Sequence, residues 1–247
     1  MDFYTGRLLR IDLTDGRAAV EPLNEAWLPL YVGGKGLLLR YLIQELGPGT
    51  VPLDPESPLL LVTGPFAGTA APTCSRLAVG CTSPATGLLL DSYVGGSFAP
   101  ELKFAGYDMV VLQGRSPEPS VVVIRDDTVT IEPGRGYWGM STSEVESALR
   151  ACVDPRANVL SVGPAGENLL PMACLSTDQY HKAGRGGAGA VMGSKNVKAV
   201  VVRGTGGVAV GDARAFAAEM RMIQSDVSTQ RTTCGRPRKA PLPWSIP

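Results

Sequence analysis

The chain has 247 residues with 23 basic and 23 acidic side chains, so its formal net charge at pH 7 is zero. That balance argues against a protein that coats nucleic acid or an anionic membrane, because such proteins carry a basic excess. Hydrophobic residues make up 44% of the chain, which excludes a disordered protein. The 30 glycines and 20 prolines therefore indicate turns or close backbone approaches.

Hydropathy predicts where the protein resides. No apolar run reaches the roughly 18 residues that a membrane span needs, and the N-terminus lacks the apolar core of a signal peptide. We therefore expect a cytoplasmic protein with no membrane partner. Low aromatic content also argues against base stacking on nucleic acid.

The predicted elements alternate between strands and helices. Asn24 and Ser97 are suitable N-caps, and Ser141 opens a stretch that resembles a capping box. In chain order, the predicted elements are strands at 6–13 and 18–22, helices at 24–30 and 35–46, strands at 59–63, 76–81 and 88–90, a helix at 97–106, strands at 109–113, 121–125 and 128–132, a helix at 141–153, strands at 159–162 and 197–202, and a helix at 213–223.

Two short segments repeat one pattern. Residues 59–68 and 158–166 each combine an apolar strand, a Gly-Pro pair and a nearby glycine, and each precedes a glycine-rich stretch with an arginine. A duplicated half-domain explains this similarity better than chance. Residues 227–247 differ in character, with four basic residues, four prolines and no acidic side chain. They indicate either a disordered tail or the scar of a truncation or frameshift.

The strongest chemical signal is the glycine-rich segment 183–193. Small residues let backbone amides approach an anion, and Arg185 can add a bidentate contact to phosphate. The segment contains GxGxxG, but it lacks the preceding strand and the later acidic residue that a dinucleotide fold needs, so we reject that interpretation. No Walker A sequence occurs around Lys35 or Lys195.

A second candidate is the segment 91–100. The pair Gly95–Gly96 directly precedes a predicted helix, whose free amides and dipole favour an anion, although a plain strand-to-helix turn explains it equally well. Arg76 opens a predicted strand and would by default be a solvated edge residue. Four methionines are predicted to fill the core: Met172, Met192, Met220 and Met222.

Metal sites are harder to place from the side chains. The five cysteines are odd in number, widely spaced and without a CxxC pair, so we expect neither a disulfide framework nor an iron–sulfur or structural zinc site of the chain's own. His181 is the single histidine, and without partners it indicates an ordinary polar loop residue.

Taken together, these segments resemble the N-terminal domain of the aldehyde ferredoxin oxidoreductase family of tungsten enzymes. The matching blocks cover roughly residues 1–203 and occur in family order: GRLLRIDL, GGKGL, TGP, APT with Arg76, TSPATG, DSYVGG, ELKFAGYD, SVGPAGENL and AGRGGAGAVMGSKNVKA. The resemblance implies an α+β fold of two related β-sheet halves with flanking helices. It also implies a pterin-binding domain at 1–206, followed at 207–247 by the truncated start of a helical domain with a disordered tail.

The resemblance implies a function as well. Family members hold tungsten (or molybdenum) in two pterin dithiolenes, with magnesium bridging their phosphates. They oxidise an aldehyde with water to a carboxylate and pass electrons through a [4Fe–4S] cluster to ferredoxin. The cluster and the acid/base residues belong to later domains, so this chain alone is not expected to oxidise aldehydes. The resemblance also allows a homodimer.

Family residues carry over by position. Arg76 matches a pterin-phosphate arginine, Gly95 and Gly96 match a phosphate-approaching pair, and Gly184–Arg185 match a second phosphate loop. The magnesium ligands would be backbone carbonyls at Tyr93 and at Lys182 or Ala183. Position 93 is often asparagine in the family, and an arginine usually stands where His181 or Lys182 stands here. A non-catalytic scaffold subunit that pairs with a cluster-bearing subunit, and a decayed fragment, are the alternative functions.

Overall fold

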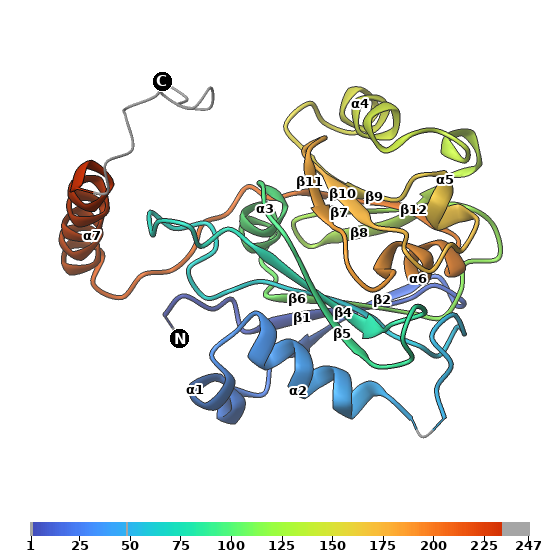
Figure 1. The fold of residues 1–247 in the computed structure, drawn as a ribbon, viewed down its shortest axis with the longest axis horizontal. Coiled ribbons are helices and arrows are strands. Elements are labelled where there is room, and N and C mark those ends of the chain that lie inside the picture. Colours follow the sequence, from blue (N-terminus) through green and yellow to red (C-terminus); the bar gives the residue numbers. More distant parts are fainter. Residues whose placement is uncertain (1, 48, 234–247) are drawn as a thin grey trace.

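Two six-stranded mixed sheets divide the chain almost in half by sequence (Figure 1). The structure is a computed structural model that describes residues 2–47 and 49–233. The first half contains β1 (Arg7–Asp12), β2 (Arg17–Pro22), η1 (Glu25–Trp27), α1 (Leu28–Tyr31), α2 (Lys35–Glu45), β3 (Leu59–Val62), β4 (Leu77–Thr82), β5 (Leu89–Val94), α3 (Phe98–Phe104) and β6 (Met109–Gln113).

The second half repeats the first and is followed by one long helix. It contains β7 (Ser120–Arg125), β8 (Thr128–Pro133), η2 (Arg135–Tyr137), α4 (Thr142–Cys152), β9 (Asn158–Ser161), α5 (Pro164–Glu167), β10 (Leu175–Thr177), β11 (His181–Ala183), α6 (Ala188–Ser194) and β12 (Val197–Arg203), before α7 (Ala213–Thr233). Among the described residues, no helix is both long and apolar enough to cross a membrane.

The two halves share one topology. The first sheet has the strand order β2-β1-β6-β3-β4-β5, and the second has the order β8-β7-β12-β9-β10-β11. In each sheet one pair is parallel, β1 with β6 and β7 with β12, and the remaining neighbours are antiparallel. The repeated segments at 59–68 and 158–166 begin at β3 and β9, which are equivalent strands. The predicted α+β fold of two related sheet halves is confirmed.

The halves are joined through one shared core between the sheets. Helix α3 of the first half packs on β9 and β12, while α6 of the second half packs on β3 and β4. Apolar side chains of both sheets therefore bury against one another, with Val79 and Leu160 as fully buried examples. Helix α2 covers the outer face of the first sheet and α4 covers that of the second (Figure 1).

Local sequence signals predicted most elements correctly. Asn24 caps η1 by accepting the Ala26 amide at 3.1 Å, and Ser141 with Glu144 forms the predicted capping box of α4. Ser97 occupies the N-cap position of α3, but its hydroxyl makes no capping bond, and Asp178 accepts its amide instead. Strand β5 runs to Val94, so Tyr93 lies on a strand and not in a loop.

The sequence did not predict α5, α6, β10 or β11. Helix α6 has low helix propensity, but its glycines allow backbone contact that larger residues forbid. A Cβ at Gly193 would lie 2.0 Å from the Gly166 oxygen, and one at Gly189 would lie 2.5 Å from the Cys174 oxygen. Tertiary packing therefore stabilises this helix, and the strands of three residues are too short to show a period.

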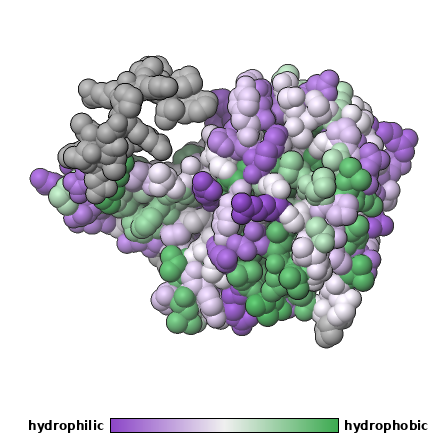
Figure 2. Space-filling model, in the orientation of Figure 1, coloured by the Kyte–Doolittle hydropathy of each residue, from purple (hydrophilic) through white to green (hydrophobic). Residues whose placement is uncertain are grey.

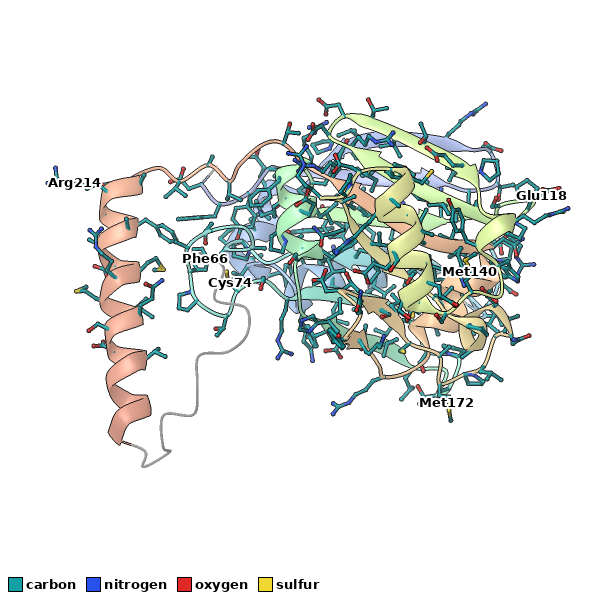
Figure 3. All side chains as sticks on the ribbon, turned by 90° about the horizontal axis from the view of Figure 1, so that it is seen from above. Phe66, Cys74, Glu118, Met140, Met172 and Arg214 are labelled. Atoms are coloured by element: carbon teal, nitrogen blue, oxygen red, sulfur yellow. The ribbon has the colours of Figure 1, made fainter. Side chains whose placement is uncertain are left out.

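Helix α7 stands apart from the sheets (Figure 3). It continues beyond the predicted end at residue 223, so residues 227–233 are helical, and the rest of the predicted tail lies outside the described residues. Phe216 anchors it, with ring centroids 5.2 Å from Phe3 and 6.0 Å from Phe66. The prediction of core methionines is correct for Met192 and wrong for Met172 and Met222, which are exposed.

Candidate functional site

The edge strands of the two sheets run past each other. Strand β5 ends the first sheet, β11 ends the second, and the two strands are in contact. A Cβ at Gly95 would lie 3.0 Å from the His181 ring, and one at Gly186 would lie 2.3 Å from Leu90. The first contact joins the end of β5 to the start of β11, and the second joins the start of β5 to the loop after β11, so the two strands run in opposite directions.

The first glycine loop, Gly95–Gly96, joins β5 to α3. Gly96 has a φ of +90°, a backbone conformation that favours glycine, and a Cβ there would lie 2.2 Å from the Asp178 carboxylate. Gly96 is therefore required by the backbone conformation of the loop. Asp178 Oδ2 accepts the Ser97 amide at 2.6 Å, so part of the α3 N-terminus is already bound to an internal carboxylate.

The second glycine loop, residues 184–187, joins β11 to α6. Gly186 and Gly187 have φ values of +69° and +85°, and both face close neighbours. Gly184 differs, because a Cβ there would meet only the Lys182 Cβ at 3.9 Å. Its backbone amide and those of Arg185 and Gly186 donate to no acceptor within residues 2–47 and 49–233. An exposed glycine with space around it and free amides beside it is suited to close approach by an anion.

Cationic side chains surround the two loops. Arg76 directly precedes β4 and lies beside the first loop, because Leu77 pairs with Val94 across the sheet. Arg76 and Arg185 are both exposed, and neither makes a hydrogen bond or ion pair with another residue that the structure describes. Lys182 is also exposed, and its ammonium donates to Ser176 and, at 3.1 Å, to the Gln179 carbonyl.

Tyr93 presents its side chain and its backbone to different surroundings. Its hydroxyl donates to Asp91 Oδ2 at 2.9 Å, and Asp91 pairs with Lys35 of α2 at 3.1 Å. Burial, with the hydrogen bond to Asp91, raises the pKa of Tyr93 to about 12, so the phenol stays protonated near neutral pH. The Tyr93 side chain is thus used in contacts with Asp91 and with the apolar cluster beneath α2.

The residues predicted for the site therefore lie around the β5–β11 pair. The part of the chain that the structure describes contains no group of three or more His, Cys, Asp or Glu side chains able to hold a metal ion. Backbone carbonyls on edge strands are suitable ligands for a hard cation, because an edge strand leaves part of its carbonyls outside the ladder. The exposed arginines and the free amides of the second loop are suited to a phosphate, whereas the Ser97 amide beside the first loop is already taken by Asp178.

Sequence reasoning missed two side chains that connect the loops to the opposite half. Asp178 binds the first loop, as described above. Ser83, in the β4–β5 turn, donates from its hydroxyl to the Gly186 carbonyl at 2.7 Å. Neither residue belongs to a local motif, and only the approach of the two halves brings them to the loops.

The surface around this pair of strands is partly apolar. Leu88 is 69% exposed, Met172 is 81% exposed and Tyr180 is 78% exposed. Leu88 directly precedes β5, and Tyr180 directly precedes β11. Met172 follows Pro171, whose carbonyl oxygen would lie 2.2 Å from a Cβ at Gly187. Figure 2 shows apolar side chains gathered over the lower part of the molecule, below a mainly hydrophilic upper part. Exposed apolar area of this kind indicates a contact surface.

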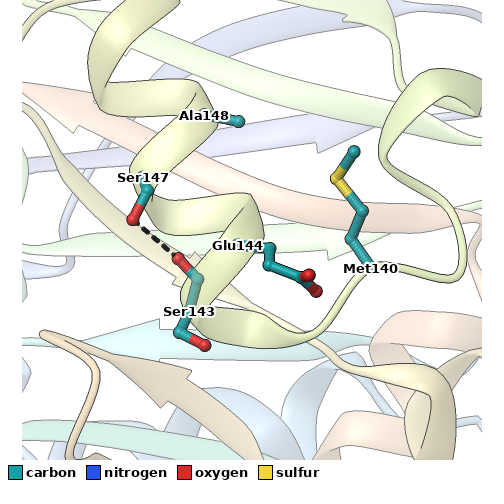
Figure 4. A pocket seen from close by; sticks show the side chains of 5 residues that line it. All are labelled: Met140, Ser143, Glu144, Ser147 and Ala148. Atoms are coloured by element: carbon teal, nitrogen blue, oxygen red, sulfur yellow. Dashed lines mark hydrogen bonds between the residues drawn. The ribbon is translucent and has the colours of Figure 1, made fainter.

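A shallow hollow also lies on α4, away from the two glycine loops. It is lined by Met140, Ser143, Glu144, Ser147 and Ala148 on the outer side of α4, and its volume is about 600 Å³ (Figure 4). Ser147 donates to the Ser143 carbonyl at 2.9 Å within the helix. Neither glycine loop reaches this hollow, so we do not assign it to the site.

The fold and the site define an α+β domain of the type found at the N-terminus of aldehyde ferredoxin oxidoreductases. Residues 8–204 match the family described as "Aldehyde ferredoxin oxidoreductase, N-terminal domain". The chain belongs to this family.

Relatives with known names are longer proteins. The chain is 42% identical over 214 residues to a tungsten-containing aldehyde ferredoxin oxidoreductase of Pyrococcus abyssi, covering 86% of this chain and 35% of the relative. It is 34% identical over 219 residues to the WOR-like subunit of an aliphatic sulfonate oxidoreductase of Pyrococcus furiosus, and the match covers 82% of this chain and 35% of the relative. The chain thus spans about a third of the length of these relatives.

A solved structure shares the fold across the whole chain. It is a chain of the active-site complex BamBC of benzoyl coenzyme A reductase, solved with 1,5-dienoyl-CoA. The TM-score is 0.90 at 34% sequence identity, and the match covers 100% of this chain and 37% of that chain. Both the sequence and the structural relatives therefore place this fold within larger oxidoreductases.

Proposed function

We propose that this chain is the tungstopterin-binding base domain of an aldehyde:ferredoxin oxidoreductase. The observation that carries the proposal is the antiparallel approach of β5, which contains Tyr93, and β11, which contains Lys182 and Ala183, with a glycine loop at the end of each strand. A site with two related halves suits a cofactor with two related halves, and the relatives are named as tungsten-containing enzymes.

The residues take separate roles in this proposal. Arg76, Gly95 and Gly96 would bind one phosphate, and Gly184 with Arg185 would bind the other through free amides and a guanidinium. The backbone carbonyls of Tyr93 and of Lys182 or Ala183 would hold the magnesium ion. When bound, the tungsten dithiolene would supply the oxygen-transfer and two-electron chemistry that converts an aldehyde and water into a carboxylate.

The protein's own contribution is placement and charge. Two rigid edge strands fix the loops, and the cationic side chains offset the negative charge of the phosphates. Electrons would leave through a [4Fe–4S] cluster to ferredoxin, and both the cluster and the aldehyde site would belong to protein beyond this domain. The exposed apolar surface beside β5 and β11 supports such a covering partner, and α7 would begin the helical domain that follows residue 206.

Isothermal titration of the chain with magnesium pyrophosphate tests this assignment. Arg185→Ala should weaken binding by about 1.5–3 kcal/mol, because it removes a charge-assisted hydrogen bond to phosphate. Arg135→Ala is the matched control, since Arg135 is exposed and its side chain pairs with Glu118 at 3.5 Å, far from both loops in the sequence. Equal affinity for wild type and Arg185→Ala would contradict the assignment of this loop.

A non-catalytic scaffold subunit that pairs with a separate cluster-bearing subunit is the second candidate. Sequencing the DNA that follows codon 247 distinguishes the two. A CxxCxxxC stretch in continuous or shifted frame supports the single-chain enzyme, and the same stretch in a separate gene supports the split one. A chain that binds no pyrophosphate would instead be a decayed fragment.

A further inference from the structure

The two glycine loops are each attached to the opposite half of the domain. Asp178, in the β10–β11 turn of the second half, accepts the Ser97 amide of the first loop at 2.6 Å. Ser83, in the β4–β5 turn of the first half, donates to the Gly186 carbonyl of the second loop at 2.7 Å. The contacts are equivalent in position, but only the Asp178 contact is made by a charged group.

Side chains of α4 hold the Asp178 carboxylate and its turn in place. Its other oxygen, Oδ1, accepts from Arg150 at 3.2 Å, and Arg150 also pairs with Glu146, at 3.3 Å. Glu146 in turn accepts the Gln179 amide at 2.8 Å. The turn is therefore bound from α4 on one side and to the start of α3 on the other.

The first loop is shaped around this carboxylate. Gly96 has a φ of +90°, and a Cβ there would lie 2.2 Å from Asp178 Oδ2. Asp178 and Gln179 themselves have φ values of +47° and +58°, which are costly for residues other than glycine. Strained backbone on the turn and a glycine facing it indicate that the position of this carboxylate is strongly determined.

We propose that Asp178 is a positioning residue for the cofactor site, and that it fixes the first glycine loop at one spacing from β11 and the second loop. The inference rests on the proposed function, because it concerns the same two loops. A ligand that bridges both loops binds well only if their spacing is set before it arrives, since otherwise the binding free energy is reduced by the cost of ordering them. A ligand that uses one loop does not depend on the spacing.

The contrast between a ligand that uses both loops and one that uses a single loop tests the positioning role, because a general loss of stability would weaken both ligands alike. The affinities of wild type and Asp178→Ala are measured for magnesium pyrophosphate, which offers two phosphoryl groups, and for orthophosphate, which offers one. We expect the ratio of pyrophosphate to orthophosphate affinity to fall by about tenfold or more, the effect of losing one charge-assisted hydrogen bond. Asp178→Asn keeps an oxygen acceptor for the Ser97 amide and should restore most of the ratio.

Asp126→Ala is the matched control. Asp126 is also a turn residue with positive φ whose carboxylate binds a distant backbone amide, that of Thr205 at 2.8 Å, but it binds neither glycine loop. The control should lower the melting temperature to a similar degree and leave the affinity ratio unchanged. If Asp178→Ala does not fold, Asp178→Ser replaces it, because the serine is too short to reach Ser97.

The outcomes separate the two proposals. If Asp178→Ala lowers the pyrophosphate-to-orthophosphate affinity ratio by less than about tenfold, the positioning role is overturned and the proposed function stands. This holds both when the two affinities fall together and when neither changes. A similar fall in Asp126→Ala overturns it as well. If wild type binds no pyrophosphate, the proposed function fails and this inference fails with it.

Discussion

The ring of His181 lies against Gly95, although the two residues belong to edge strands of different sheets: a Cβ at Gly95 would lie 3.0 Å from the ring's Nδ1. With the contact between Leu90 and Gly186, this approach aligns β5 and β11 in opposite directions. The glycine loops therefore lie at opposite ends of one strand pair. The two halves of the domain meet where the candidate cofactor residues gather.

Alanine at Gly96 and at Gly184 should have different effects. Gly96→Ala places a Cβ against Asp178 at a φ of +90°, so we expect a loss of about 1–3 kcal/mol in the free energy of unfolding. Gly184→Ala meets open space and should leave stability within about 0.5 kcal/mol of wild type. Its effect should appear as weaker binding of magnesium pyrophosphate. Urea unfolding and isothermal titration measure the two quantities, and equal destabilisation by both variants would contradict the account.

The ion pair of Lys198 and Glu167 should be essential to the second half. Both side chains are buried, and the Lys198 ammonium also donates to the Met140 carbonyl at 2.8 Å. Glu167→Gln leaves a buried charge without its partner, so we expect a loss of about 3–5 kcal/mol in unfolding free energy. The double variant Lys198→Met with Glu167→Leu removes both charges and should cost less than the sum of the two single changes. Additive losses in urea unfolding would contradict this prediction.

Lys195 should make stability depend on alkaline pH. Its ammonium is buried against the Pro55 and Gly114 carbonyls, and burial, with the nearby Arg115 charge, lowers its pKa from 10.5 to about 8. Between those values the unfolded chain holds more protons than the folded one. The free energy of unfolding contributed by this group should therefore rise with pH from about 8 to about 10.5, by at most about 1.4 kcal/mol per pH unit.

Comparison with Lys195→Met isolates this effect from other titrating groups. Urea unfolding of both proteins at three pH values across that window should show the difference in unfolding free energy shifting in favour of wild type as the pH rises. A difference that stays constant, or shifts toward the variant, would show that the amine is not perturbed in the folded state.

Sequence alone predicted the parts of the fold that local chemistry determines. The N-terminal hairpin follows from its alternation, and α4 follows from the capping box of Ser141 and Glu144. Helix α6 could not be predicted this way, because Gly189 and Gly193 disfavour a helix locally and are required only by the backbone of a neighbouring segment. Within the glycine-rich segment 183–193, the structure gives every glycine except Gly184 a close neighbour, so only Gly184 is left without a packing reason.

The candidate site likewise has parts that the sequence predicts and parts that it does not. Glycine-rich turns next to arginine are visible in the sequence, so both loops could be predicted. Asp178 and Ser83 could not, because their partners lie 81 and 103 residues away along the chain. Such contacts depend on how the two halves pack, and no local pattern encodes them.

The central claim is that the two loops form one anion site across the β5–β11 pair. A titration of the ¹⁵N-labelled chain with magnesium pyrophosphate tests it most directly. The account predicts that the amide signals of Gly95, Gly96, Gly184 and Arg185 shift together with a single dissociation constant. Shifts confined to one loop, shifts elsewhere on the protein, or no shifts at all would contradict it.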